Sequence, residues 1–80
     1  MITEKDLLKW GFVRGEYSEG YLCTYEGNAI WFYPDCQRLM IYSDGDDYLD
    51  LSYCPTKRKA DQALRLLGLP PIDKLKEIKK

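Results

Sequence analysis

The sequence predicts an α+β fold: a short N-terminal helix, a four- to five-stranded antiparallel β-meander, and a C-terminal helix packed on one face of the sheet, with a short helical tail. All seven tyrosines lie between Tyr17 and Tyr53, in short runs separated by glycine and aspartate turns. Apolar residues at helical spacing flank this region on both sides. The predicted loops of three to five residues favour sequential hairpins, and therefore a meander.

The N-terminal segment carries the start and stop signals of one short helix. Thr3 can cap the helix, Asp6 stands three residues later as its capping-box partner, and Gly11 occupies a typical C-terminal position. We therefore expect a helix at about 4–10. A helix this short is stable only when packed, so its apolar residues should face the sheet. These residues are Leu7, Leu8 and Trp10.

The central region alternates in the manner of strands. Strands are expected at 12–17, 21–25, 29–33, 39–42 and 48–53, with the run at 29–33 as the central strand. The dipeptide Gly27-Asn28 indicates a tight hairpin turn, and 43–47 is an acidic turn. In the last strand, alternation places one set of side chains on each face. The two sets are Leu49, Leu51 and Tyr53, and Tyr48, Asp50 and Ser52.

A second helix is expected from Thr56 to about Leu67, where Gly68 ends it. One face of this helix is apolar, and Leu66 lies off it. The apolar face consists of Ala60, Ala63, Leu64 and Leu67. We take 1–68 as a single domain and 69–80 as a proline elbow with a short basic helical tail. The apolar residues of that tail, which must pack, meet a partner or fray, are Ile72, Leu75 and Ile78.

The composition argues against most enzyme classes. The chain has no histidine, which removes the commonest general base and metal ligand, and its glycines form no phosphate-binding loop. The spacing of Cys23, Cys36 and Cys54 does not fit a zinc site and indicates free thiols in a reducing compartment. The acidic turn from Asp44 lacks the spacing of a calcium-binding loop. We expect no catalytic activity, metal or cofactor. No membrane span or secretory signal is evident, so the expected location is the cytoplasm.

The aromatic residues point to a binding module. Side chains on successive strand positions alternate between faces, so eleven aromatic residues cannot all point inward. The tyrosines considered for the exposed face are Tyr21, Tyr25, Tyr42 and Tyr48. The proposed anchor cluster is Trp31, Tyr33, Tyr42 and Tyr48. The acidic residues expected to steer a basic protein partner are Asp44, Asp46 and Asp47. Cross-strand aromatic pairing that stabilises a thin sheet is the competing interpretation. A small accessory or inhibitor protein, of mobile-element or phage origin, would fit this pattern.

Charge is unevenly distributed along the chain, and this suggests nucleic-acid binding as an alternative to protein binding. Residues 1–56 hold ten acidic and four basic residues, whereas 57–80 hold three acidic and eight basic residues. The segment from Thr56 to Ala63, TKRKADQA, resembles the opening of the last helix of the double-stranded RNA-binding domain. The resemblance covers about eight residues, and that family's Gly-Pro-x-His loop has no counterpart here. It implies phosphate contacts through Lys57, Arg58 and Lys59. The chain is expected to be a monomer or a weak homodimer that forms through an edge strand or the tail.

Overall fold

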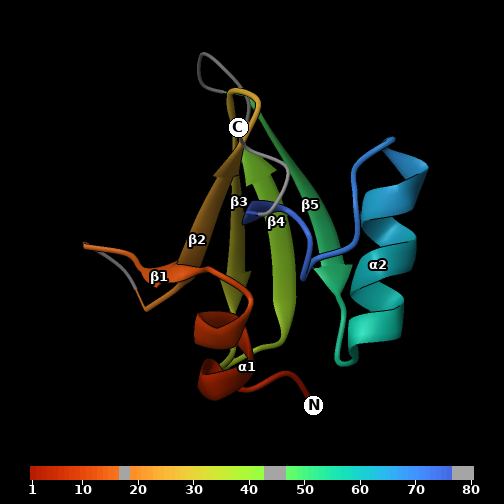
Figure 1. The fold of residues 1–80 in the computed structure, drawn as a ribbon. Helices are drawn as coiled ribbons and strands as arrows, with labels where there is room; N and C mark the ends of the chain where they lie inside the picture. The colour runs from red at the N-terminus through yellow and green to blue at the C-terminus, as the bar shows by residue number, and fades with distance from the viewer. Residues whose placement is uncertain (17–18, 43–46, 77–80) are drawn as a thin grey trace.

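A computed structural model describes residues 1–16, 19–42 and 47–76, and the architecture is α+β as predicted. The helices are α1 (Glu4–Lys9) and α2 (Lys57–Leu66). The strands are β1 (Val13–Arg14), β2 (Tyr21–Tyr25), β3 (Asn28–Tyr33), β4 (Arg38–Tyr42) and β5 (Tyr48–Tyr53). They form one antiparallel sheet in the order β1-β2-β3-β4-β5, so the predicted meander is confirmed. Both helices and the described segment after α2 lie on the same side of the sheet, so no described helix covers its other side (Figure 1).

The predicted cap of α1 is present. The Thr3 hydroxyl accepts a hydrogen bond from the Asp6 amide, and the Asp6 carboxylate accepts one from the Thr3 amide. Leu7 is fully buried and Trp10 packs partly against the core. The expectation for Leu8 was wrong, because its side chain is 52% exposed. A helix of six residues presents less than two full turns, which is too narrow a face to bury two adjacent leucines.

Two expectations about the first hairpins need correction. The first strand, expected at 12–17, is two residues long, and Phe12 before it is buried in the core. The turn between β2 and β3 lies at Glu26-Gly27, one residue before the expected position, and Asn28 pairs with Tyr25. Both turn residues have positive φ, 49° and 86°, as a two-residue hairpin with the right-handed twist of its strands requires.

A bulge changes the face assignment in β5. Met40 pairs with Asp50, but Leu39 pairs with Ser52, so one extra residue lies in β5 at this point. Ser52 adopts a left-handed conformation with φ of 68°, and its amide donates a hydrogen bond to the Asp50 carboxylate at 2.7 Å. Beyond the bulge the alternation is inverted. Tyr53 therefore pairs with Arg38 on the uncovered side of the sheet and not on the side of Leu51, as had been expected.

The second helix follows the prediction in its start and end, but Leu67, expected on its apolar face, is the C-cap residue and is 43% exposed. The Thr56 hydroxyl caps α2 by accepting a hydrogen bond from the Lys59 amide, and Gly68 follows with a left-handed φ of 76°. Leu66 is 87% exposed, as its position off the apolar stripe implied. In the next segment residues 72–75 form turns and Lys76 is in 3₁₀ helical conformation, and Ile72 and Leu75 are fully buried. Ile78 lies outside the described residues.

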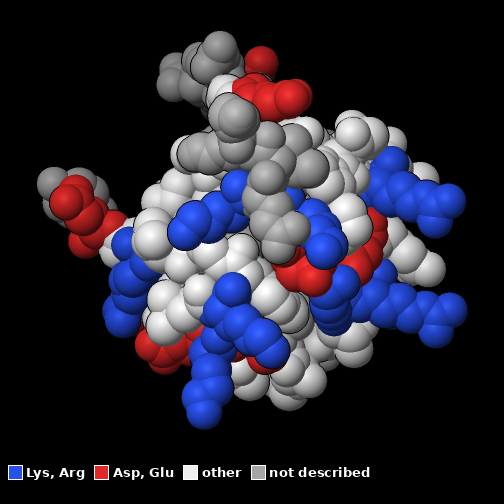
Figure 2. All heavy atoms as spheres, viewed as in Figure 1, with Lys and Arg blue, Asp and Glu red and all other residues white. Residues whose placement is uncertain are grey.

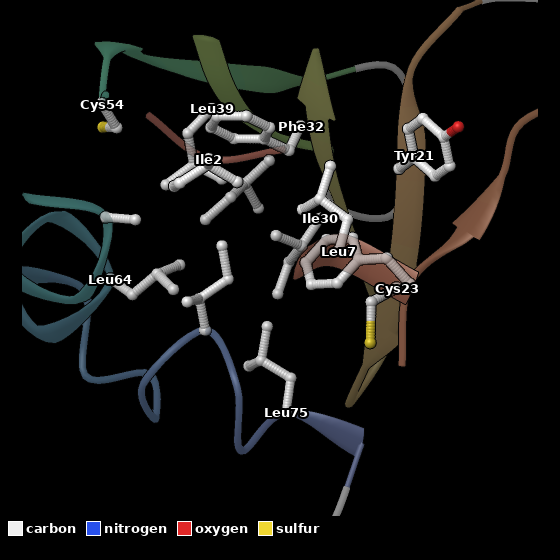
Figure 3. Close-up of a cluster of buried hydrophobic side chains, with 14 residues drawn as sticks. Ile2, Leu7, Tyr21, Cys23, Ile30, Phe32, Leu39, Cys54, Leu64 and Leu75 are labelled. Atoms are coloured by element: carbon white, nitrogen blue, oxygen red, sulfur yellow. The ribbon is translucent and has the colours of Figure 1, made fainter. Parts of the chain in front are cut away.

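The core lies between the sheet and the helical side (Figure 3). Strand residues such as Ile30 and Phe32 meet Leu64 of α2 and Leu75 of the C-terminal segment. Gln37, between β3 and β4, is a buried polar residue. Its amide nitrogen donates to the carbonyls of Ile2 and Pro34, both at 2.8 Å, and its side-chain oxygen accepts from the Ile2 amide at 2.9 Å.

Candidate functional site

The side of the sheet that no described helix covers is its most aromatic surface. We call it the open face. Strand register places on it, by alternation, every second residue of β2 to β5, except that the bulge in β5 inserts one extra residue between Asp50 and Tyr53. Its residues on β2 to β5 are Leu22, Thr24, Ala29, Trp31, Tyr33, Arg38, Met40, Tyr42, Tyr48, Asp50 and Tyr53. All four residues of the predicted anchor cluster are thus on one surface.

Trp31 and Tyr33 form the first aromatic pair of the open face. Their ring centres are 6.0 Å apart and their planes differ by 16°. The rings lie against the backbone of two glycines. A Cβ atom added to Gly15 would come within 2.5 Å of the Trp31 ring, and one added to Gly20 within 2.7 Å of the Tyr33 ring. Only glycine leaves room for this contact, and an aromatic ring over a strand glycine is a recognised way to compensate for its missing side chain.

Tyr42 and Tyr48 form the second pair, across the β4–β5 ladder. Their ring centres are 5.4 Å apart and their planes differ by 28°. Tyr48 is 59% exposed, so stacking leaves much of its surface accessible to solvent. The other two tyrosines considered for this face were wrongly assigned. Tyr21 is buried and Tyr25 packs against the core, because their strand positions share the face of Cys23.

A groove of about 720 Å³ crosses the open face beside the first aromatic pair. We call it the aromatic groove. Its lining consists of Val13, Arg14, Glu16, Leu22, Trp31, Tyr33 and Tyr42. The volume lies within the range of about 300–1,000 Å³ that is typical of ligand pockets. The groove therefore combines aromatic and apolar side chains with an acidic residue, Glu16.

An ion pair between β4 and the edge strand β5 lies on the open face. Arg38 contacts Asp50 through two guanidinium nitrogens, at 3.0 and 3.1 Å, and the two residues lie on adjacent strands. Hydrogen bonding from Arg38, with a second hydrogen bond from the Ser52 amide, lowers the pKa of the Asp50 carboxyl. The hydrogen bond to Asp50 raises the pKa of Arg38. The pair neutralises itself and adds no net charge to the face.

The sheet region is strongly acidic. Residues 12–55 contain eight acidic residues and only two basic ones, Arg14 and Arg38. Arg38 is paired with Asp50, and the Arg14 guanidinium lies 6.0 Å from the centre of the Tyr21 ring. Arg14 is paired with Tyr21 in the ladder, so its charge lies on the helical side of the sheet. Both basic side chains are thus engaged within the molecule.

Most of the described basic residues belong to the two helices and the segment after α2. Figure 2 shows lysine and arginine spread over the side that carries both helices, with some acidic residues between them. Lys57 contacts Asp61 at 2.7 Å and Asp73 at 3.2 Å, and the hydrogen bond to Asp61 raises its pKa. Asp61 also accepts a hydrogen bond from the Ile72 amide at 2.8 Å. Lys57 and Asp61 therefore fasten the C-terminal segment to α2, whereas Arg58 and Lys59 are exposed.

The acidic turn is described only in part. Asp47 is exposed immediately before β5, while Asp44 and Asp46 lie outside the described residues. The three cysteines are free, with Cys23 and Cys54 buried and Cys36 exposed. Among residues 1–16, 19–42 and 47–76, no group of three or more histidine, cysteine or acidic residues is arranged to hold a metal ion.

Two features of this site were not predicted from the sequence. They are the contact of the Trp31 and Tyr33 rings with Gly15 and Gly20, which we call the glycine bed, and the position of Glu16 beside the groove. Gly15 had been placed within the strand expected at 12–17 and Gly20 in the turn after it, yet the Gly15 amide donates to the Gly20 carbonyl at 2.9 Å beneath the aromatic pair. Glu16, next to this contact, was not singled out. Two glycines that flank a hairpin opposite an aromatic strand are the signal that could have identified this arrangement.

Comparison of the chain with known protein families, with characterised proteins and with solved structures found no match. No helix within the described part of the chain is both long and apolar enough to cross a membrane. The site itself must therefore carry the functional argument.

Proposed function

We propose that this protein is a small non-catalytic binding module that recognises a basic protein partner through its open face. The observation that carries the proposal is the aromatic surface left uncovered on one side of the sheet, with Trp31 stacked on Tyr33 and Tyr42 on Tyr48. Exposed tyrosine and tryptophan side chains supply large contact areas at low entropic cost, and they dominate the energetics of many protein interfaces.

Charge complementarity indicates the chemistry of the partner. The sheet region has an excess of six acidic residues, and its two basic residues are both engaged within the molecule. Asp47 directly precedes Tyr48 in the chain, and the sequence adds Asp44 and Asp46 to the same turn. A basic surface would therefore be attracted to this side of the molecule, and the attraction would weaken with salt.

Nucleic-acid binding through Lys57, Arg58 and Lys59 is the alternative, and the contacts of α2 favour it less. The Lys57 ammonium group already contacts two carboxylates, which leaves Arg58 and Lys59 as the exposed cations of that turn. The acidic sheet region would also repel a polyanion. The proposed test distinguishes the two functions.

The test is affinity capture from lysate of the source cell, with and without nuclease. Three forms are compared: the wild type, a Tyr42→Ala/Tyr48→Ala variant, and a matched Arg58→Ala/Lys59→Ala variant on the opposite side. Circular dichroism and urea titration establish that each variant is folded. Trp31→Ala is kept as a second aromatic variant, in case the tyrosine pair contributes to stability.

The proposal expects one basic protein that the wild type and the Arg58/Lys59 variant retain after nuclease treatment, and that the aromatic variants lose. Capture that depends on nucleic acid, or on Arg58 and Lys59, would establish the alternative. Retention by both folded aromatic variants would overturn the assignment to the open face.

A further inference from the structure

The aromatic groove differs from the rest of the open face in its charge. Glu16 lines it and forms no ion pair with any residue that the structure describes. Arg14 also lines it, but its guanidinium lies over Tyr21 on the other side of the sheet. The negative charge of Glu16 is therefore not compensated within the groove.

The aromatic rings add to this negative potential. The planes of the Trp31 and Tyr33 rings differ by 16°, and both rings line the groove together with Glu16. Aromatic faces attract cations through their quadrupole, and tryptophan does so most strongly. A neutral apolar side chain would bury the carboxylate without a partner, which costs free energy, whereas a cationic side chain would compensate it.

A planar cation fits this surface better than a spherical one. A guanidinium group stacks on an aromatic plane while its edge donates hydrogen bonds to a carboxylate. A lysine ammonium group is more strongly hydrated and has no plane to stack. The groove also has a long apolar wall, from Val13 and Leu22, against which the methylene groups of an arginine can lie.

We propose that the aromatic groove is a subsite for an arginine side chain of the partner, with the guanidinium stacked on Trp31 and Tyr33 and paired with Glu16. This inference rests on the proposed function, since it names the partner group that enters the open face. The glycine bed fixes the two rings, so the subsite is formed before the partner arrives.

The test needs no knowledge of the partner. The full chain, labelled with nitrogen-15, is titrated with the blocked peptide acetyl-Gly-Ser-Arg-Ser-Gly-amide, and with versions carrying lysine or citrulline in place of arginine. Citrulline has nearly the shape of arginine without the charge. Binding is followed at the indole N–H of Trp31, which the Trp31→Phe spectrum assigns and distinguishes from that of Trp10.

Two matched variants test the role of the carboxylate. Glu16→Gln removes the charge beside the groove, and Glu26→Gln removes a charge from the exposed β2–β3 turn, which does not line it. We expect the arginine peptide to shift the Trp31 indole signal with millimolar affinity. Glu16→Gln should weaken it about 2- to 5-fold, as for an exposed cationic contact. Glu26→Gln should change it by less than about 1.5-fold, because the charge is remote and screened.

Each other outcome counts against the inference. If the citrulline peptide binds as tightly as the arginine peptide, the groove does not recognise the charge. If the lysine peptide binds as tightly as the arginine peptide, the groove has no preference for arginine. Equal effects of Glu16→Gln and Glu26→Gln, or shifts that avoid Trp31, would reduce the interaction to general charge attraction. None of these results decides the capture experiment, so the subsite can fail while the binding role of the open face stands.

Discussion

Replacing Gln37 by alanine removes the contacts that join the N-terminus to the β3–β4 turn. The Gln37 side chain is 3% exposed and makes three hydrogen bonds to backbone groups, two of them to Ile2. Its own carbonyl accepts a hydrogen bond from the Cys54 amide at 2.7 Å, so the residue also connects this turn to the end of β5. The alanine variant keeps the Cys54 contact and loses the other three.

The expected loss is large for so small a domain. A typical intramolecular hydrogen bond contributes about 0.5–1.5 kcal/mol, and a buried backbone group left without a partner costs about 1–3 kcal/mol. Because water can reach part of the vacated site, we expect Gln37→Ala to lower the free energy of unfolding by about 2–4 kcal/mol. A chain of this size is stable by roughly 4–12 kcal/mol in total.

Urea unfolding followed by circular dichroism measures this change directly. Two further variants separate the contributions of side chain and backbone. Gln37 has a left-handed φ of 54°, so Gln37→Gly should be more stable than Gln37→Ala by about 1 kcal/mol. Gln37→Glu would place a carboxylate against the Ile2 and Pro34 carbonyls, which raises its pKa. Its stability relative to wild type should therefore rise as pH falls from about 7 to 5, because protonation restores a donor.

A result that refutes this reasoning is easy to recognise. If Gln37→Ala and Gln37→Glu both unfold within about 0.5 kcal/mol of the wild type, the Gln37–Ile2 contacts contribute no net stability. If the glutamate variant shows the same pH dependence as the wild type, the amide nitrogen is not the donor on which this site depends.

Three other predictions follow from single residues. Glu26→Asn should raise the free energy of unfolding by about 0.5–1 kcal/mol, because Glu26 has a φ of 49° in the two-residue turn and asparagine tolerates this conformation better; an unchanged urea midpoint would contradict it. A colorimetric thiol reagent should react with one thiol in the native protein and with three in the unfolded protein. Cys36 is exposed whereas Cys23 and Cys54 are buried, and burial raises the pKa of the Cys54 thiol. Rapid reaction of three thiols in the native protein would show that the core opens. The hydrogen bond from Arg38 lowers the pKa of Asp50, so the stability that this ion pair contributes is present above the ordinary aspartate pKa of about 4 and is lost as pH falls through the lowered value. The difference in urea midpoint between wild type and Asp50→Asn should therefore shrink from pH 5 to pH 2. A constant difference would mean that the pair does not stabilise the fold.

The order of helices and strands could be predicted from the sequence because the residues that begin and end the helices act through local backbone geometry. The Thr3 and Thr56 caps and the left-handed Gly11 and Gly68 mark the helix ends without help from tertiary structure. The anchor residues Trp31, Tyr33, Tyr42 and Tyr48 were brought to one face by simple alternation, which holds within each strand.

The errors lie where one strand depends on another. Tyr53 changed sides because a bulge at β5 adds a residue, and nothing in a single strand reveals its partner's register. Tyr21 was placed outside because a tyrosine can occupy either face, whereas its strand position shares the buried face of Cys23. The contacts of Gln37 join residues 35 positions apart, a separation at which local sequence carries no signal.

The glycine bed under the aromatic pair also constrains how this sequence can change over generations. Any side chain at Gly20 would displace the Tyr33 ring, and any at Gly15 would displace Trp31. If either glycine is substituted, the ring above it can no longer pack against the backbone. If either aromatic residue is substituted, the backbone of the glycine below it is left uncovered. Among descendants of this chain, the two glycines and the two aromatic residues should thus be inherited or lost together, as four linked positions and not as four independent ones.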